Sequence, residues 1–272
     1  MVDVSASLLV GIAATFVPLL VGLLVPKAVT VKRKSQRVTL WLVAGASGMM
    51  FWSFIDVMGD ATQLDINQGF GTGLGDYTHL VLALMFAGGV GLMFGLELFY
   101  SRSKSPDTDT SRTESSTDAP WPGEMIFAVA VVAAIGVGFH ALGEGVYVGS
   151  SLPNAPSVLD AIGGTLPGIA YILHKGLEGF VIGVFAVLAR ATSNRNIGIL
   201  AAVSGVPTVI GFFIGIGNRV EPTYFFALGA AEAVYVEMKL VPLFSQGNRV
   251  YASIVPFLLG FYAMYIAGLF HS

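Results

Sequence analysis

The sequence contains no cysteine and little charge. Without cysteine the chain has no disulfide bonds, no thiolate metal ligands and no cysteine nucleophile. Charged residues make up 11% of the 272 residues, whereas 54% are hydrophobic. Ordinary soluble domains carry about 25% charged residues, and a soluble protein could not keep so apolar a surface in water. The composition therefore predicts an integral membrane protein with the lipid bilayer as its surroundings.

Three further absences narrow the function. The net charge of −3 provides no basic field for nucleic acid, so we expect no nucleic-acid partner. No G-x-x-x-x-G-K-[ST] loop occurs, which argues against a built-in ATPase. No A-x-A-like cleavage site follows the first apolar run, which is therefore interpreted as a retained helix and not as a signal peptide. These features favour a multi-pass protein of a cell membrane, plasma or inner.

Eight apolar runs approach the length of about 20 residues that a helix needs to cross a bilayer. They predict an all-α membrane protein with one transmembrane domain over residues 1–272. The predicted spans are Ser7–Val25, Val38–Met58, His79–Tyr100, Glu124–Val148, Leu166–Arg190, Ile197–Ile216, Tyr224–Phe244 and Tyr251–Phe270.

The basic residues predict the orientation of these spans. If both termini lie outside the cytoplasm, 12 of the 14 Lys and Arg residues fall in inner loops or at an inner helix end. The two others are Arg219, which lies outside, and Lys175, which lies within a span. Cytoplasmic loops of membrane proteins carry an excess of Lys and Arg, so the count predicts extracytoplasmic termini.

The segment 101–120 differs from the rest of the chain in composition. It is rich in Ser, Thr, Asp and Pro and has almost no apolar residue. Such a segment buries too little surface to order itself, so we predict a disordered cytoplasmic loop between the third and fourth spans. It contains no histidine, and no metal binding is assigned to it.

The fourth and fifth spans each carry the pattern H-x-x-x-E-G-x-x-x-G. The first copy contains His140 and Glu144, and the second contains His174 and Glu178. Residues four apart lie on one face of a helix, so each span presents an imidazole and a carboxylate to the same point. The short connection between the spans predicts antiparallel neighbours, and the glycines are predicted to let their backbones approach closely.

Two imidazoles and two carboxylates suit a divalent transition metal. Zinc fits this ligand set, as do iron(II), manganese and cobalt. Ionisable residues within a membrane are costly and usually mark a pathway or a site, although a single one can serve as an interhelical hydrogen bond. An intramembrane metal-dependent enzyme is the alternative, but its di-iron form uses Glu-x-x-His, and no H-E-x-x-H motif occurs. A retinal photoreceptor, suggested by the intramembrane Lys175, fits less well because such proteins place that lysine in their last helix.

The paired motif resembles the Zrt/Irt-like (ZIP) family of metal transporters, whose fourth and fifth helices carry His-x-x-x-Glu-Gly signatures. Eight spans, outside termini and a variable cytoplasmic loop after the third span are similar to that family. The resemblance implies a non-enzymatic transporter with inverted-repeat character that moves zinc, or iron, manganese or cadmium, into the cytoplasm. It also implies a homodimer and assigns the metal, the transported substrate, to His140, Glu144, His174 and Glu178. No organic cofactor is implied.

The chain departs from the family pattern inside the motif. Many members have Asn after the first histidine and Pro before the first glutamate, where this chain has Ala141 and Gly143. Two-metal members carry an acidic residue after the second histidine, where this chain has Lys175. We therefore expect a single-metal site in which Lys175 takes the place of the second metal. The alternative is that Lys175 extends to the membrane interface, as long basic side chains do near helix ends.

Other acidic residues are candidates for the transport route. The family resemblance suggests that Asp56 collects metal at the outer entrance, although it is equally well explained as an interfacial acid. Glu232 and Glu237 lie in the seventh span, and Glu237 is placed to receive the leaving ion or to pair with Lys239 or Arg190. Glu97, near the inner end of the third span, is expected to be solvated.

Overall fold

Backbone hydrogen bonding explains why the apolar runs fold as helices. Lipid offers no partner for an exposed amide, and an α-helix pairs its N–H and C=O groups within one segment. The computed structural model describes residues 4–32, 35–67, 78–103, 123–152, 160, 164–217, 220, 222–245 and 249–269. Over these ranges the chain forms eight long helices and no strand, which confirms the all-α prediction.

Each predicted span corresponds to one helix. The helices are α1 (Val4–Lys32), α2 (Gln36–Asn67), α3 (Thr78–Ser103), α4 (Gly123–Ser151), α6 (Thr165–Leu188), α7 (Asn194–Gly217), α8 (Thr223–Phe244) and α9 (Arg249–Gly268).

Several helices continue beyond the apolar runs. α1 extends to Lys32, past Val25, and α3 extends to Ser103, past Tyr100. Hydropathy marks where contact with lipid stops, whereas backbone hydrogen bonding can continue into polar sequence. Residues 101–103 of the predicted disordered loop 101–120 continue α3, and the rest of that loop lies outside the described residues.

Seven of the eight helices are long and apolar enough to cross a membrane. The eighth, α8, has 22 residues but carries Glu232, Glu237 and Lys239 along its length. The chain is thus a multi-pass helical protein of membrane type.

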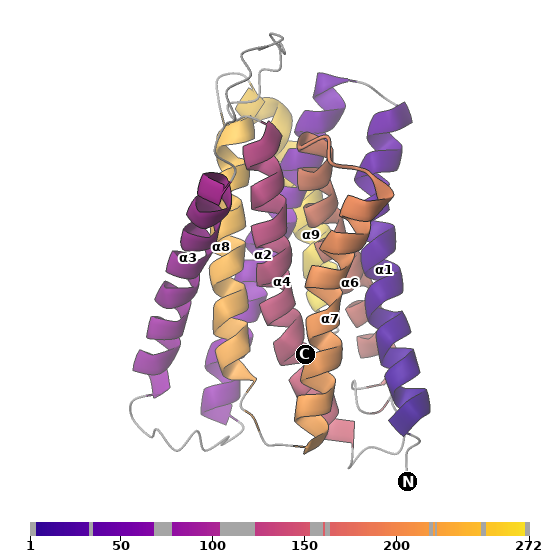
Figure 1. Ribbon diagram of the computed structural model, residues 1–272, viewed down its shortest axis with the longest axis vertical. Coiled ribbons are helices and arrows are strands. Elements are labelled where there is room, and N and C mark those ends of the chain that lie inside the picture. Colours follow the sequence, from indigo (N-terminus) through magenta and orange to yellow (C-terminus); the bar gives the residue numbers. More distant parts are fainter. Residues whose placement is uncertain are drawn as a thin grey trace.

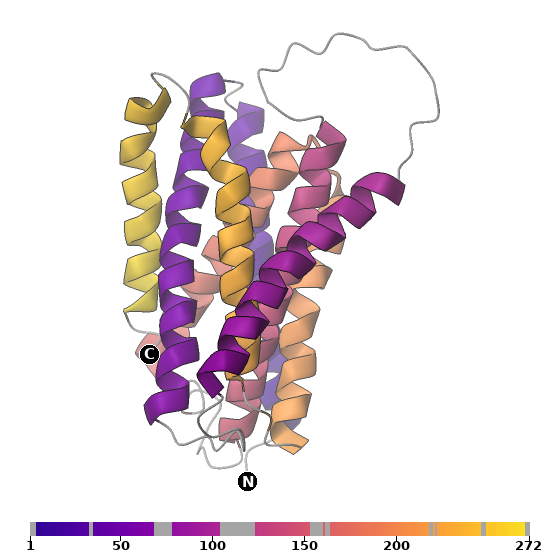
Figure 2. The same cartoon turned by 90° about the vertical axis from the view of Figure 1, so that its left-hand side faces the viewer.

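α4 is the central helix of the bundle. In its most apolar window 72% of the residues are buried inside the protein, whereas the value is 22% for α3 and 28% for α1 and α9. α4 contacts α3, α6, α7 and α8. Figure 1 shows it near the middle of the bundle between α8 and α7, and Figure 2 shows α3 crossing the bundle obliquely at one side. The peripheral helices turn large apolar side chains outward, as expected for surfaces in contact with lipid.

Two helix pairs, α4–α7 and α1–α6, have the most extensive packing. In each pair a motif glycine lies against the backbone of the neighbour: a Cβ atom at Gly145 would overlap the carbonyl of Thr208, and one at Gly179 would overlap that of Leu19. The prediction that these glycines draw the two motif helices against each other is therefore wrong. α4 and α6 do contact each other, but less extensively, and the glycines hold each of them against an outer neighbour.

Candidate metal site

The repeated motif brings four ionisable side chains together where α4 meets α6. A nitrogen of His140 and of His174 and an oxygen of Glu144 and of Glu178 all lie within 4.8 Å of one another. The exposed fractions of these residues are 6%, 1%, 4% and 3%, respectively. In the part of the chain that the structure describes, no other group of three or more metal-ligating residues gathers in this way.

Each histidine faces the glutamate one turn later on its own helix. His140 Nε2 lies 3.3 Å from Glu144 Oε1, and His174 Nε2 lies 3.1 Å from Glu178 Oε1. Between the helices, His140 Nε2 lies 3.6 Å from Glu178 Oε1, and the centres of the two imidazole rings are 5.6 Å apart. The contacts therefore use Nε2 of each histidine and Oε1 of each glutamate.

These separations suit a four-coordinate metal ion. With bonds of about 2.1 Å, the ligand atoms of a tetrahedral zinc ion lie about 3.4 Å apart. Three of the distances, 3.1, 3.3 and 3.6 Å, bracket that value. The remaining pairs lie within 4.8 Å, so tetrahedral coordination would require the farthest of them to shorten by up to about 1.4 Å.

His140 Nε2 and Glu144 Oε1 lie 3.3 Å apart but form no hydrogen bond in the part of the chain that the structure describes. Leaving a buried polar atom without a hydrogen bond costs about 1–3 kcal/mol, and more for a charged group. A cation held between the two helices would give both atoms a ligand bond, so their placement suits a bound ion.

Lys175 occupies the other side of both carboxylates. Its Nζ lies 2.5 Å from Glu144 Oε2 and 2.8 Å from Glu178 Oε2, and its side chain is fully buried. Each carboxylate therefore presents Oε1 to the histidines and Oε2 to the ammonium. The alternative that Lys175 extends to the membrane interface is wrong, because the short ion pairs hold the ammonium inside the bundle.

The Glu-Gly step of the motif orients each ligand helix. Successive residues of a helix are about 100° apart around its axis, so Glu144 can face the cluster while Gly145 faces α7. In the same way Glu178 faces the cluster while Gly179 faces α1. α8 supports the site from behind: an added Cβ at Gly229 would lie 2.7 Å from His140 Cβ.

Glu232 lies one helical turn from the cluster. On α4, Gly136 precedes His140 by one turn, and a Cβ at Gly136 would overlap the side chain of Glu232. Glu232 is 3% exposed, and its Oε1 has no hydrogen-bond partner among the described residues. It is therefore a buried carboxylate beside the site but outside the group of four.

The other two predicted route residues lie away from the cluster. Asp56 is half-buried on α2 and faces the end of α9, where a Cβ at Gly268 would lie 3.4 Å from its Oδ1. Glu237 accepts a hydrogen bond from Ser47 Oγ at 2.7 Å, which links α8 to α2. The structure thus places both residues between helices and gives neither a contact with the four candidate ligands.

A second, partly buried ion pair joins α3 to α8. Lys239 Nζ lies 2.8 Å from Glu97 Oε1 and 2.7 Å from Glu97 Oε2, and Tyr235 donates a hydrogen bond to Glu97 Oε2 at 2.9 Å. The expectation that Glu97 is solvated is wrong, because it is only 8% exposed. The suggested partners of Glu237 are also wrong: Lys239 pairs with Glu97, and Glu237 bonds to Ser47.

Tyr171 and Thr15 complete the surroundings of Lys175 and were not anticipated. Their hydroxyl oxygens are 2.9 Å apart, and Lys175 Nζ lies 5.7 Å from the centre of the Tyr171 ring. Tyr171 precedes Lys175 by one turn, so the i, i+4 spacing was a usable signal. Thr15 lies on α1, and nothing in the local sequence identifies it as a neighbour.

Fold and site together define a multi-pass helical protein with a buried His/Glu group able to hold a metal ion. No protein-family model matches the chain, and a comparison with curated proteins gives no match.

Proposed function

We propose that this chain is a membrane transporter for a divalent transition metal, with zinc as its first substrate. The observation that carries the proposal is the group formed by His140, Glu144, His174 and Glu178, buried between two helices of a multi-pass bundle. A transported ion must leave water and find replacement ligands inside the membrane, and this group supplies four. Nitrogen and carboxylate oxygen donors suit zinc, and also iron(II), manganese and cadmium.

The ZIP family remains the best candidate for the type of transporter. The proposal rests on the repeated motif and on eight helices, with α8 as a further spanning helix whose charges lie within the bundle. It includes extracytoplasmic termini, inverted-repeat character, a homodimer, a cell-membrane location and import into the cytoplasm. The alternating exposure of a central site to the two sides follows the general strategy of secondary transporters.

The proposal also assigns a single ion to the site. With neutral imidazoles, the two glutamates and Lys175 sum to one negative charge, so one divalent ion brings the group to a single positive charge. A second divalent ion would have to compete with the ammonium for Oε2 of Glu144 and Glu178. Strong uncompensated charge inside a bilayer is costly, which favours one ion at a time.

The proposed route continues along α8. Glu232 is the buried carboxylate next to the site, and Glu237 lies further along the same helix in the direction of the predicted cytoplasmic side. Asp56 is assigned to the opposite, outer side of the membrane. These three residues would bind the ion only transiently as it moves, because each supplies a single carboxylate.

The test is metal uptake by the purified full chain in proteoliposomes. Zinc, cadmium, iron(II) and manganese are compared, with His174→Ala as the site variant and His271→Ala, at the C-terminal end, as the matched control. We expect zinc entry that His174→Ala abolishes and His271→Ala preserves. Uptake that survives in His174→Ala would overturn the assignment of the site.

The same experiment separates transport from the enzyme alternative. An intramembrane metal-dependent enzyme would retain its metal through purification and carry none across the bilayer. Absence of uptake for all four metals, together with metal still bound to the purified protein, would favour that alternative.

A further inference from the structure

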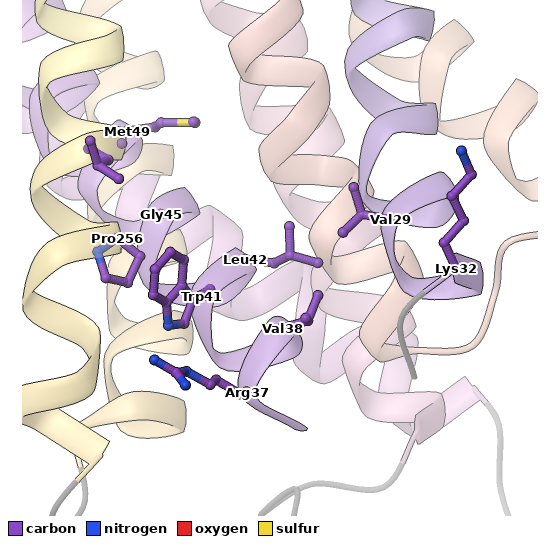
Figure 3. Close-up of a pocket in the computed structure, with 11 residues that line it drawn as sticks. Val29, Lys32, Arg37, Val38, Trp41, Leu42, Gly45, Met49 and Pro256 are labelled. Carbon is purple, nitrogen blue, oxygen red and sulfur yellow. The ribbon is translucent and has the colours of Figure 1, made fainter. Parts of the chain in front are cut away.

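A long groove opens between α1, α2 and α9, away from the candidate metal site. Its volume is about 800 Å³, within the range of about 300–1,000 Å³ typical of ligand sites. Figure 3 shows Val29 of α1, Val38 and Leu42 of α2 and Pro256 of α9 arranged across it. The lining is predominantly apolar, so the groove suits a hydrocarbon chain.

The groove has the depth of one membrane leaflet. Along α2 its lining runs from Arg37 to Met49, a difference of 12 residues. At 1.5 Å per residue this corresponds to about 18 Å. Half the hydrocarbon thickness of a bilayer is about 15 Å, so an acyl chain that enters at the Arg37 end would reach the region of Met49.

Two basic side chains line the groove. They are Lys32 at the end of α1 and Arg37 at the start of α2, and both are exposed. In Figure 3 Arg37 lies at the shallow end beside Trp41, whereas Lys32 lies on the opposite side with its side chain directed away from Arg37, toward the level of Met49. Neither has a carboxylate partner in the described part of the chain, and Arg37 lies 5.8 Å from the centre of the Trp41 ring. In sequence, residues 27–37 contain five Lys or Arg and no acidic residue.

We propose that this groove binds an anionic phospholipid. The phosphate lies at the shallow end of the groove, where Arg37 is exposed, and one acyl chain follows α2 toward Met49. Basic pockets between transmembrane helices on the cytoplasmic side are a recurring form of anionic-lipid site, because positive charge at the headgroup level meets negative charge while the chain stays in hydrocarbon. Trp41 lies where aromatic side chains favour the interface.

A second copy of the chain is a less suitable occupant. In a two-fold contact the same patch lies on both partners, so the basic openings of two copies would face each other. That arrangement places like charges together at the shallow end of the groove. The phosphate of an anionic phospholipid would instead neutralise positive charge at the shallow end of the groove, and its acyl chain would fill the apolar part of the groove.

Native mass spectrometry of the full chain in detergent tests the proposal. Phosphatidylglycerol is the anionic probe, and phosphatidylcholine with the same acyl chains is the neutral one. Lys32→Gln/Arg37→Gln removes two charges at the groove, and Arg190→Gln/Arg195→Gln removes two charges at the α6–α7 turn as the matched control. Val38→Trp narrows the groove, and Val206→Trp, on an exposed face of α7, is its control.

We expect one phosphatidylglycerol bound per chain in preference to phosphatidylcholine. Because a basic residue attracts the phosphate of an anionic lipid, Lys32→Gln/Arg37→Gln should weaken phosphatidylglycerol binding about tenfold or more. Val38→Trp should weaken the binding of both lipids, whereas neither control should change it. Equal binding of the two lipids, equal loss in the two charge variants, or a dimer that excludes lipid would overturn the proposal.

Discussion

Lys175 Nζ on α6 lies 2.5 Å from Glu144 Oε2 on α4. It also lies 2.8 Å from Glu178 Oε2 on its own helix. The fully buried ammonium thus joins α6 to α4 through the carboxylates that the candidate site would use. Removing one partner of a buried ion pair leaves an uncompensated charge, at a cost of about 3–5 kcal/mol. Lys175 is therefore a structural tie between the two helices, and within the proposed function it takes the place of a second cation.

Replacing Lys175 by alanine is expected to destabilise the metal-free protein by a few kcal/mol. In the presence of zinc part of that stability should return, and the bound stoichiometry should rise above one ion per chain, with altered transport. Thermal unfolding with and without zinc, together with metal analysis, measures both effects. Lys27→Ala, half-buried on α1, is the control. Unchanged transport and stoichiometry would exclude the substitute role.

The two glutamates are expected to differ in their importance for metal binding. Glu178 Oε1 lies 3.1 and 3.6 Å from Nε2 of the two histidines, whereas Glu144 Oε1 lies 3.3 Å from Nε2 of His140 and farther from His174. Glu178→Gln should therefore weaken zinc binding at least about tenfold, or about 1.4 kcal/mol, and more than Glu144→Gln does. Titration calorimetry of the purified variants measures the difference. A larger effect at Glu144 would contradict this geometry.

The candidate site was predictable because its information is local. A histidine and a glutamate four residues apart share a helix face whatever the helix packs against, so the set of four could be read from the two motifs. Hydropathy located all eight helices for the same reason. The partners of Lys175 could be predicted from the sequence only in part. Glu178 is one turn away on α6, whereas Glu144 lies on another helix.

Long-range partners could not be read from the sequence. Gly145 and Gly179 indicate that some backbone approaches closely, but a glycine carries no information about which helix that is. Glu97 and Lys239 are separated by 142 residues, and hydropathy near the end of α3 suggests solvent for Glu97. Only the packing of α3 on α8 turns that position into a buried pair.

The glycines of α6 allow a direct test of its close packing. A Cβ at Gly179 would overlap the Leu19 carbonyl, whereas one at Gly176 would meet nothing closer than 3.6 Å. Gly179→Ala should therefore cost about 1–3 kcal/mol, as overpacking does, and also weaken zinc binding by moving α6. Gly176→Ala on the same helix is the control. Thermal unfolding compares the two, and equal stability would refute the packing argument.

The ion pair between α3 and α8 is expected to show strong coupling. Glu97→Gln or Lys239→Met alone leaves one partly buried charge without its partner, whereas the double variant removes both charges. We expect each single variant to be destabilised and the double variant to lose less than the sum, with a coupling of about 0.5–3 kcal/mol. Unfolding measurements on all four proteins give this value. Simple additivity would mean that the pair contributes nothing.

A variant of Glu232 can separate zinc affinity from the rate of zinc transport. It lies one turn from His140 but outside the group of four, and its Oε1 has no partner in the described part of the chain. Within the proposed transport function, Glu232→Gln should slow zinc uptake several-fold while leaving equilibrium zinc binding unchanged, because the route loses a charge and the site loses no ligand. Glu237→Gln, whose carboxylate is bonded to Ser47, should have a smaller effect. Stopped-flow uptake and calorimetry on the same preparations separate rate from affinity. A parallel loss of both in Glu232→Gln would instead make Glu232 a direct ligand of the ion.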